Sequence, residues 1–139
     1  MGSLRRFGVS MEEDLLEKFD HLARSRGYSN RSEFLRDLAR RELIQQRWEL
    51  EDAEVAGTVT LVYDHDARGL GDELTHLQHD HHELVLSTMH VHLDERNCLE
   101  VVVLRGPAAR VRSLANALIS RRGVKHGQLT MTSTGRELP

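Results

Sequence analysis

The first fifty residues constrain the fold most, because they carry one short strand and two helices and no further element to cover them. Residues 4–11 alternate in character, which predicts a strand: one side carries Arg5, Phe7, Val9 and Met11, and the other carries Leu4, Arg6, Gly8 and Ser10. A lone strand leaves both edges unpaired, and so small a segment buries little apolar surface. Both problems disappear if two copies pair their strands antiparallel and interlock their helices. The segment therefore predicts an obligate dimer.

Two helices are predicted to follow this strand. Ser10-Met11-Glu12-Glu13 has the form of a capping box and predicts the start of the first helix, and Gly27 fits its C-cap. Asn30-Arg31-Ser32-Glu33 predicts the cap of the second helix. Apolar residues recur at helical spacing in both: Leu15, Leu16, Phe19 and Leu22 in the first, and Phe34, Leu35, Leu38, Leu43 and Ile44 in the second.

The pattern changes at Gly57, after an acidic stretch that we interpret as a helix end and a linker. We divide the chain into a domain over residues 1–48, a linker over 49–56 and a second domain over 57–139. In the second domain we expect strands over 58–63, 87–93, 98–104 and 124–132, with helices over 69–86 and from Gly106-Pro107 to about Arg122. The order βαββαβ is the ferredoxin-like arrangement, so the whole chain is of the α+β class.

Composition and charge narrow the function classes. Hydrophobic residues make up 39% and charged residues 29% of the 139, as in soluble globular proteins. The longest apolar run, residues 101–104, is far short of the ~20 residues that span a bilayer. We find no signal peptide, and the single cysteine, Cys98, fits a reducing cytoplasm. The net charge is −3, but residues 1–48 carry ten basic and eight acidic side chains, so a local patch can still bind phosphate.

The second domain carries a concentration of metal-ligating side chains. Five of the nine histidines lie between residues 76 and 90, and His92 and Cys98 follow closely. On the strand over 87–93 we expect Met89, Val91 and Leu93 to face the core, so that His90 and His92 share the opposite face. A turn with an odd number of residues would put Cys98 on the histidine face, within cross-strand reach of His92.

Two imidazoles and one thiolate leave a fourth ligand to be found. The helix over 69–86 offers His76, His79 and His82 or Glu83 about a turn apart, opposite its leucine stripe. Nitrogen and sulfur ligands of this kind suit Ni(II), Cu(II), Co(II) or Zn(II). The alternatives are surface histidines with a cysteine that serves only as a small buried apolar residue, or a hydrolase that uses Cys98.

His90-Val91-His92, then Cys98-Leu99-Glu100 after five residues, with Gln78-His79 upstream, resembles the ligand signature of the NikR nickel-responsive regulators. The resemblance continues over most of the chain, through Arg31-Ser32-Glu33, Arg36-Asp37, residues 57–65 and residues 123–127. It implies an N-terminal ribbon-helix-helix (βαα) DNA-binding domain and a C-terminal ACT-like domain. It also implies a homotetramer, built as a dimer of dimers, that represses transcription, with nickel uptake genes as the expected targets.

The same resemblance implies the site residues. His90, His92 and Cys98 of one subunit would bind Ni(II), one ion per subunit, and His79 of a neighbouring subunit would complete a square-planar site. Glu100 would support the ligands from the same strand face.

In the DNA-binding domain, the resemblance assigns the major-groove contacts to Arg6, Gly8 and Ser10 on a double-stranded, palindromic operator. Gly8 departs from the polar residue common in relatives. The helix N-terminus near Asn30, Arg31 and Ser32 is expected to hold phosphate. Glu33 and Asp37, four apart on one helix, would form a weak cation site for K⁺, or are simply screened by neighbouring arginines.

Three other functions stay open from the sequence. One is a ribbon-helix-helix regulator that senses Co, Cu, Zn or a small molecule. The second is the hydrolase already mentioned, and the third is nickel storage without DNA binding. The resemblance favours a cytoplasmic nickel-responsive regulator that is not an enzyme.

Overall fold

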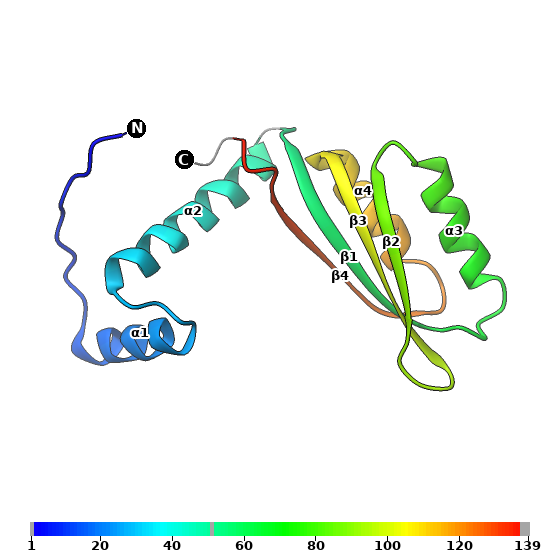
Figure 1. Cartoon of the computed structure of the whole chain (residues 1–139), viewed down its shortest axis with the longest axis horizontal. Helices are drawn as coiled ribbons and strands as arrows, with labels where there is room; N and C mark the ends of the chain where they lie inside the picture. Colours follow the sequence, from blue (N-terminus) through cyan, green and yellow to red (C-terminus); the bar gives the residue numbers. More distant parts are fainter. Residues whose placement is uncertain (1, 51, 137–139) are drawn as a thin grey trace. The chain divides into compact units, whose positions relative to one another are not determined.

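The computed structural model describes residues 2–50 and 52–136, with the side chains of residues 49 and 50 left out, and it divides into two compact units. The N-terminal unit extends to Gln46 and the C-terminal unit begins at Arg47 (Figure 1). Within the described residues, no helix is both long enough and apolar enough to cross a membrane.

The N-terminal unit is built on two helices, α1 (Glu13–Ser25) and α2 (Arg31–Leu50). The turn between them begins at Gly27, whose φ of 85° suits glycine, and the Tyr28 N–H returns to the Ala23 carbonyl at 2.9 Å. Asn30 then caps α2, because its Oδ1 accepts from the Glu33 N–H at 2.9 Å. The predicted caps at Gly27 and Asn30 are therefore confirmed.

The core of this unit is small. Phe34 is fully buried, and its ring lies 4.8 Å from that of Phe19 and 4.9 Å from that of Tyr28. Three of the nine predicted stripe residues stay exposed, and so do three apolar residues of the preceding segment: Leu15, Leu22 and Leu43, and Leu4, Phe7 and Val9. An unpartnered copy of this unit therefore leaves much of its apolar surface in water.

Two expectations for the N-terminal segment are wrong in this structure. Residues 4–11 form no strand, and the chain has no regular secondary structure from residue 2 to residue 12. The reason is physical, because a strand exists only with a hydrogen-bonded neighbour and one chain supplies none. Ser10 does not cap α1, which starts after Glu12 without a side-chain cap hydrogen bond.

The C-terminal unit has the predicted order βαββαβ. Its elements are β1 (Glu54–Asp64), α3 (Leu70–Asp80), β2 (Val85–His92), β3 (Asn97–Pro107), α4 (Ala108–Ile119) and β4 (Val124–Ser133). The strands form one antiparallel sheet in the order β2-β3-β1-β4, and both helices pack on one of its faces (Figure 1). The α+β class and the ferredoxin-like arrangement are therefore confirmed.

Several predicted bounds shift in this unit. β1 begins at Glu54, so residues 54–56 of the expected linker belong to the sheet, while α2 runs to Leu50. α3 ends at Asp80, and the rest of the long helix expected over 69–86 is a turn leading into β2. The turn still delivers the apolar Leu84 to the core, where it is 2% exposed.

The face assignment of β2 is wrong. Met89, Val91 and Leu93 are 58%, 39% and 52% exposed and do not face the core. His90 lies opposite Glu100 and His92 opposite Cys98 in the β2–β3 register, so the histidines point to the face that α3 and α4 cover. Alternation shows which residues share a face, but it does not show which face the helices cover.

Candidate metal centre

Cys98 and His92 form the centre of the candidate site. They are cross-strand partners where β2 and β3 meet at the hairpin, and Cys98 Sγ lies 3.4 Å from His92 Nδ1. Two ligand atoms of one metal ion, each about 2.0–2.3 Å from it, lie roughly 3.0–3.6 Å apart. The spacing therefore fits two ligands of one ion, and the predicted parity of residues 90, 92 and 98 holds.

His65 joins these two residues, although its role was left open by the sequence. Ligand atoms of His65, His92 and Cys98 all lie within 4.8 Å of one another. The ring is fixed because its Nδ1 donates to the Arg96 carbonyl at 2.9 Å, across the point where β1 ends opposite the start of β3. In the sequence, His65 stands out only because it follows the strand predicted over 58–63. The β1–β3 register is needed to show that this position lies beside Cys98.

His90 lies beside the group, with its ring centre 5.3 Å from that of His92. Its Nδ1 is 3.3 Å from the Tyr63 hydroxyl, so Nε2 is the nitrogen that remains for a metal. Tyr63 itself lies opposite Cys98 in the β1–β3 register. The two histidines therefore offer different nitrogens to an ion near Cys98.

The surroundings of the thiol are negative. Burial raises the pKa of Cys98, and the charges of Asp64, Asp66, Asp94 and Glu100 raise it further. The free thiol thus holds its proton more tightly than an exposed cysteine. The same carboxylates lower the electrostatic energy of a cation, so a divalent ion is favoured where a bare thiolate is not.

Glu100 is buried on the same face, two residues along β3 from the thiol. It accepts from the Tyr63 hydroxyl and from Gln78 Nε2, each at 3.4 Å. Burial raises the pKa of Tyr63 strongly, and the Glu100 charge adds to the effect. Gln78 belongs to α3, so this carboxylate connects the sheet to the helix that carries His79.

His79 is exposed on α3 and lies apart from the cluster in a single chain. Among the described residues, no group of three ligating side chains within 4.8 Å includes His79 or His90. His79 lines a shallow depression of about 250 Å³ together with Thr75, Gln78, His82 and Val85. Within one chain, the described residues therefore do not place His79 together with the other predicted ligands.

The predicted DNA contacts lie in the N-terminal unit. Arg6, Gly8 and Ser10 are exposed in the extended segment, and Ser32 is exposed in the first turn of α2. Arg31 is already engaged, because its Nε and Nη2 reach the two carboxylate oxygens of Asp20 at 2.8 and 2.7 Å. This guanidinium lowers the pKa of Asp20, and it is held in one orientation.

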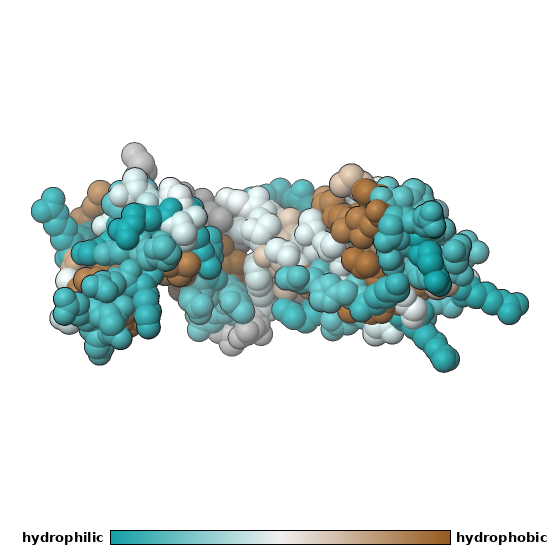
Figure 2. Space-filling view, turned by 90° about the horizontal axis from the view of Figure 1, so that it is seen from below, coloured by the Kyte–Doolittle hydropathy of each residue, from teal (hydrophilic) through white to brown (hydrophobic). Residues whose placement is uncertain are grey.

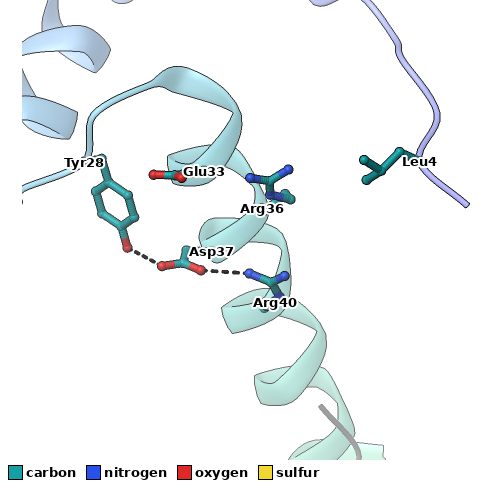
Figure 3. Close-up of a pocket in the computed structure, with 6 residues that line it drawn as sticks. All are labelled: Leu4, Tyr28, Glu33, Arg36, Asp37 and Arg40. Carbon is teal, nitrogen blue, oxygen red and sulfur yellow. Dashed lines mark hydrogen bonds and ion pairs between the residues drawn. The ribbon is translucent and has the colours of Figure 1, made fainter. Parts of the chain in front are cut away.

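Figure 3 shows the pocket that contains the predicted cation residues Glu33 and Asp37, a groove of about 430 Å³. Both carboxylate oxygens of Asp37 are in use: Tyr28 donates to one, and Arg40 reaches the other at 3.0 Å. These contacts lower the pKa of Asp37, with the Tyr28 hydrogen bond as the largest cause. In this state Arg40 pairs with Asp37, while Glu33 accepts a hydrogen bond from the Ser29 hydroxyl at 3.3 Å.

Comparisons with known proteins cover both units. Residues 56–132 match the family model of the NikR C-terminal nickel-binding domain, and residues 5–46 match that of ribbon-helix-helix proteins of the copG family. A solved structure of an uncharacterised protein of Thermotoga maritima has a TM-score of 0.52 at 17% identity, over 58% of this chain and all of that one. That likeness concerns the fold alone.

Full-length relatives agree with the family models. A protein of Nitratidesulfovibrio vulgaris (strain Miyazaki F) is 56% identical over 138 residues, and those of Solibacter usitatus and Geobacter sulfurreducens are each 57% identical over 138. Each alignment covers 99% of both chains, and each relative is named as a nickel-responsive regulator. The chain therefore belongs to the NikR family of nickel-responsive DNA-binding regulators, and it is not an enzyme.

Proposed function

We propose that this protein is a repressor that binds one Ni(II) per subunit. The nickel-bound form then binds a palindromic operator that controls nickel uptake genes. The observation that carries the proposal is the convergence of His90, His92 and Cys98 on one sheet face, in surroundings made negative by carboxylates. Imidazole nitrogen and thiolate sulfur are suitable ligands for Ni(II).

In the proposed site His92 binds through Nδ1, His90 through Nε2, and Cys98 through Sγ. His79 of a neighbouring subunit supplies the fourth ligand, and Glu100 supports the set from beside it. The exposure of His79 on α3 supports this assignment, because its own unit does not use it as a core residue. The nickel ion, when bound, supplies the bond that joins two subunits.

The surface of each unit supports a homotetramer built as a dimer of dimers. Apolar residues face water on the uncovered side of the sheet, where Met89 and Val91 are exposed beside the half-buried Leu99 and Val101. The N-terminal unit exposes apolar side chains as well, and Figure 2 shows apolar surface on both units. Patches of this kind mark protein–protein contacts, so we assign one subunit interface to each unit.

Regulation in this proposal is a population shift. Nickel must bind better to the arrangement of subunits in which both pairs of N-terminal units contact one operator. Paired segments from two chains, carrying Arg6, Gly8 and Ser10, would read bases, while Asn30, Ser32 and the start of α2 hold phosphate. We place this activity in the cytoplasm, where the single thiol stays reduced.

The proposal also includes the weak cation site. We propose that Glu33 and Asp37 bind K⁺ when DNA is bound, in a state in which Arg40 no longer contacts Asp37.

A second candidate function is sensing of another metal. It is favoured by His65, which with His92 and Cys98 gives three donors within one chain, a set suited to a tetrahedral ion such as Zn(II).

Operator binding measured with stoichiometric Ni(II), Co(II), Zn(II) or Cu(II), and with none, tests the proposal. We expect nickel to give the tightest DNA complex and the metal-free protein to bind weakly. Equal operator affinity with and without nickel would contradict nickel-dependent repression. Stronger activation by Zn(II) or Co(II) than by nickel would favour the second candidate, and His65→Ala should then abolish that response.

A further inference from the structure

The hydroxyl of a buried tyrosine, Tyr63, lies against the metal centre. Tyr63 is not one of the proposed ligands. Tyr63 is 3% exposed on the covered face of β1, and Glu100 beside it is 7% exposed. The Tyr63 oxygen lies 3.3 Å from His90 Nδ1 and 3.4 Å from Glu100 Oε2. One phenol thus contacts a metal-ligating ring and a carboxylate at the same time.

The chemistry of the three groups fixes the direction of the hydrogen bonds. A carboxylate only accepts, so the single phenolic hydrogen of Tyr63 is donated to Glu100. The phenol oxygen then has only lone pairs to offer to His90, whose Nδ1 must therefore carry the hydrogen. A neutral ring protonated at Nδ1 has its lone pair on Nε2.

Glu100 is held in place by Gln78 of α3, which is itself held by Thr88 of β2. Gln78 of α3 donates its Nε2 hydrogen to Glu100 Oε1 at 3.4 Å, and its own Oε1 accepts from Thr88 Oγ1 at 2.6 Å. The donors run in one direction, from β2 through α3 to the carboxylate. The acceptor for the Tyr63 hydroxyl is therefore kept in position before any metal arrives.

We propose that Tyr63 is a positioning residue that fixes His90 in the tautomer protonated at Nδ1, so that Nε2 is presented to nickel. The inference rests on the proposed nickel site and adds the residue that selects the ligating nitrogen. An unrestrained neutral histidine prefers the hydrogen on Nε2, which is the wrong tautomer for this site. When Tyr63 fixes the tautomer in advance, nickel binding no longer has to include the free energy of changing it. Outer hydrogen-bond partners of metal-ligating histidines commonly have this role.

The test uses the full-length, nickel-free protein labelled with ¹⁵N and studied by NMR at about pH 8, where an ordinary histidine is neutral. Wild type should show His90 protonated at Nδ1. Tyr63→Phe keeps the ring but removes the hydroxyl, and His90 should shift toward the Nε2-protonated form. Nickel affinity, measured against a competing chelator, should fall by roughly 10- to 100-fold. Tyr28→Phe makes the same chemical change in the N-terminal unit and should alter neither measurement.

Glu100→Leu provides a second route if Tyr63→Phe folds poorly. Without its acceptor, the Tyr63 hydroxyl is free to donate to His90 Nδ1, so the same tautomer shift is expected while the phenol stays in place. A His90 ring that stays protonated at Nδ1 in a folded Tyr63→Phe or Glu100→Leu protein would overturn the inference. Since the tautomer is read without metal, failure of wild type to bind nickel would refute the proposed function separately.

Discussion

Mixing two inactive variants tests whether nickel joins subunits. His79→Ala removes the proposed bridging ligand, and Cys98→Ala removes the thiolate. His79 is exposed, so its loss should change the free energy of unfolding by less than about 0.5 kcal/mol. Cys98 is fully buried but small, and replacing it should cost about 1 kcal/mol. Both variants should therefore fold and assemble.

The expected recovery follows from the geometry of the site. A complete site in a mixed tetramer takes Cys98 from a His79→Ala subunit and His79 from a Cys98→Ala subunit. With equal amounts and random exchange, about a quarter of the sites meet both conditions. A site contained within one subunit would never be complete. His76 lies on the same helix and is exposed, so mixing His76→Ala with Cys98→Ala serves as the control and should leave about half of the sites complete.

The assay is the sulfur-to-nickel charge-transfer absorption, recorded after subunit exchange has been verified with differently tagged chains. Cys98→Ala alone should lack the band, and His79→Ala alone should hold nickel weakly with an altered spectrum. The mixture should regain about a quarter of the wild-type absorption, and the control mixture about half. If the first mixture regains no native spectrum while the control does, His79 does not act between subunits and the bridging mechanism fails.

Three further predictions test other parts of the molecule. Arg6→Ala should weaken operator binding by roughly 1–3 kcal/mol in a DNA titration and leave the nickel stoichiometry unchanged. Loss of nickel binding in this variant would contradict the assignment of DNA binding to the N-terminal unit and nickel binding to the C-terminal unit. Because burial raises the pKa of the Cys98 thiol, nickel must displace a proton from it at neutral pH. The nickel affinity should therefore rise about tenfold per pH unit until that pKa is reached. Calorimetry in several buffers measures the released proton, and a nickel affinity that does not change with pH would exclude the thiolate as a ligand. Hydrogen bonds from the Asn97 side chain and from backbone N–H groups lower the pKa of Asp94 from 3.8 to about 2, so this carboxylate stabilises the fold above about pH 4 and loses its effect as the pH falls through 2. Asp94→Asn should lower Tm at neutral pH, with the difference shrinking toward pH 2, and an unchanged Tm at pH 7 would contradict this.

The order of elements in the C-terminal unit could be predicted from the sequence, because each element carries its own period and its own stop signal. Gly106-Pro107 marks the start of α4, and Gly123, with a φ of 103°, follows its end. The strand over 4–11 could not be treated in the same way. Its alternation is visible in the sequence, but a strand needs a hydrogen-bonded neighbour, and the described residues of one chain supply none.

The candidate site was predictable where it depends on local spacing and not where it depends on tertiary register. The two-residue interval between His90 and His92 fixes their common face. The contribution of His65 depends on the β1–β3 pairing, which places Asp64 opposite Asn97 and brings the next residue to the hairpin. Tyr63 gave no sequence signal at all, because an aromatic residue in a strand is ordinarily a core residue.

The exposed apolar residues of β2 change how the metal centre relates to assembly. Met89 and Val91 occupy one face of the strand, while His90 and His92 occupy the other. A slip of one residue would turn the apolar pair toward the face that the helices cover and the histidines toward the uncovered face. One register therefore governs both the candidate metal site and the exposed apolar face that we propose as a subunit interface. The hairpin turn sets that register, and its backbone is fastened by the hydrogen bonds to Asp94, whose Oδ1 accepts from the Arg96 and Asn97 N–H groups at 2.9 and 2.7 Å. A small exposed turn thus sets the position of both the proposed ligands and the proposed interface.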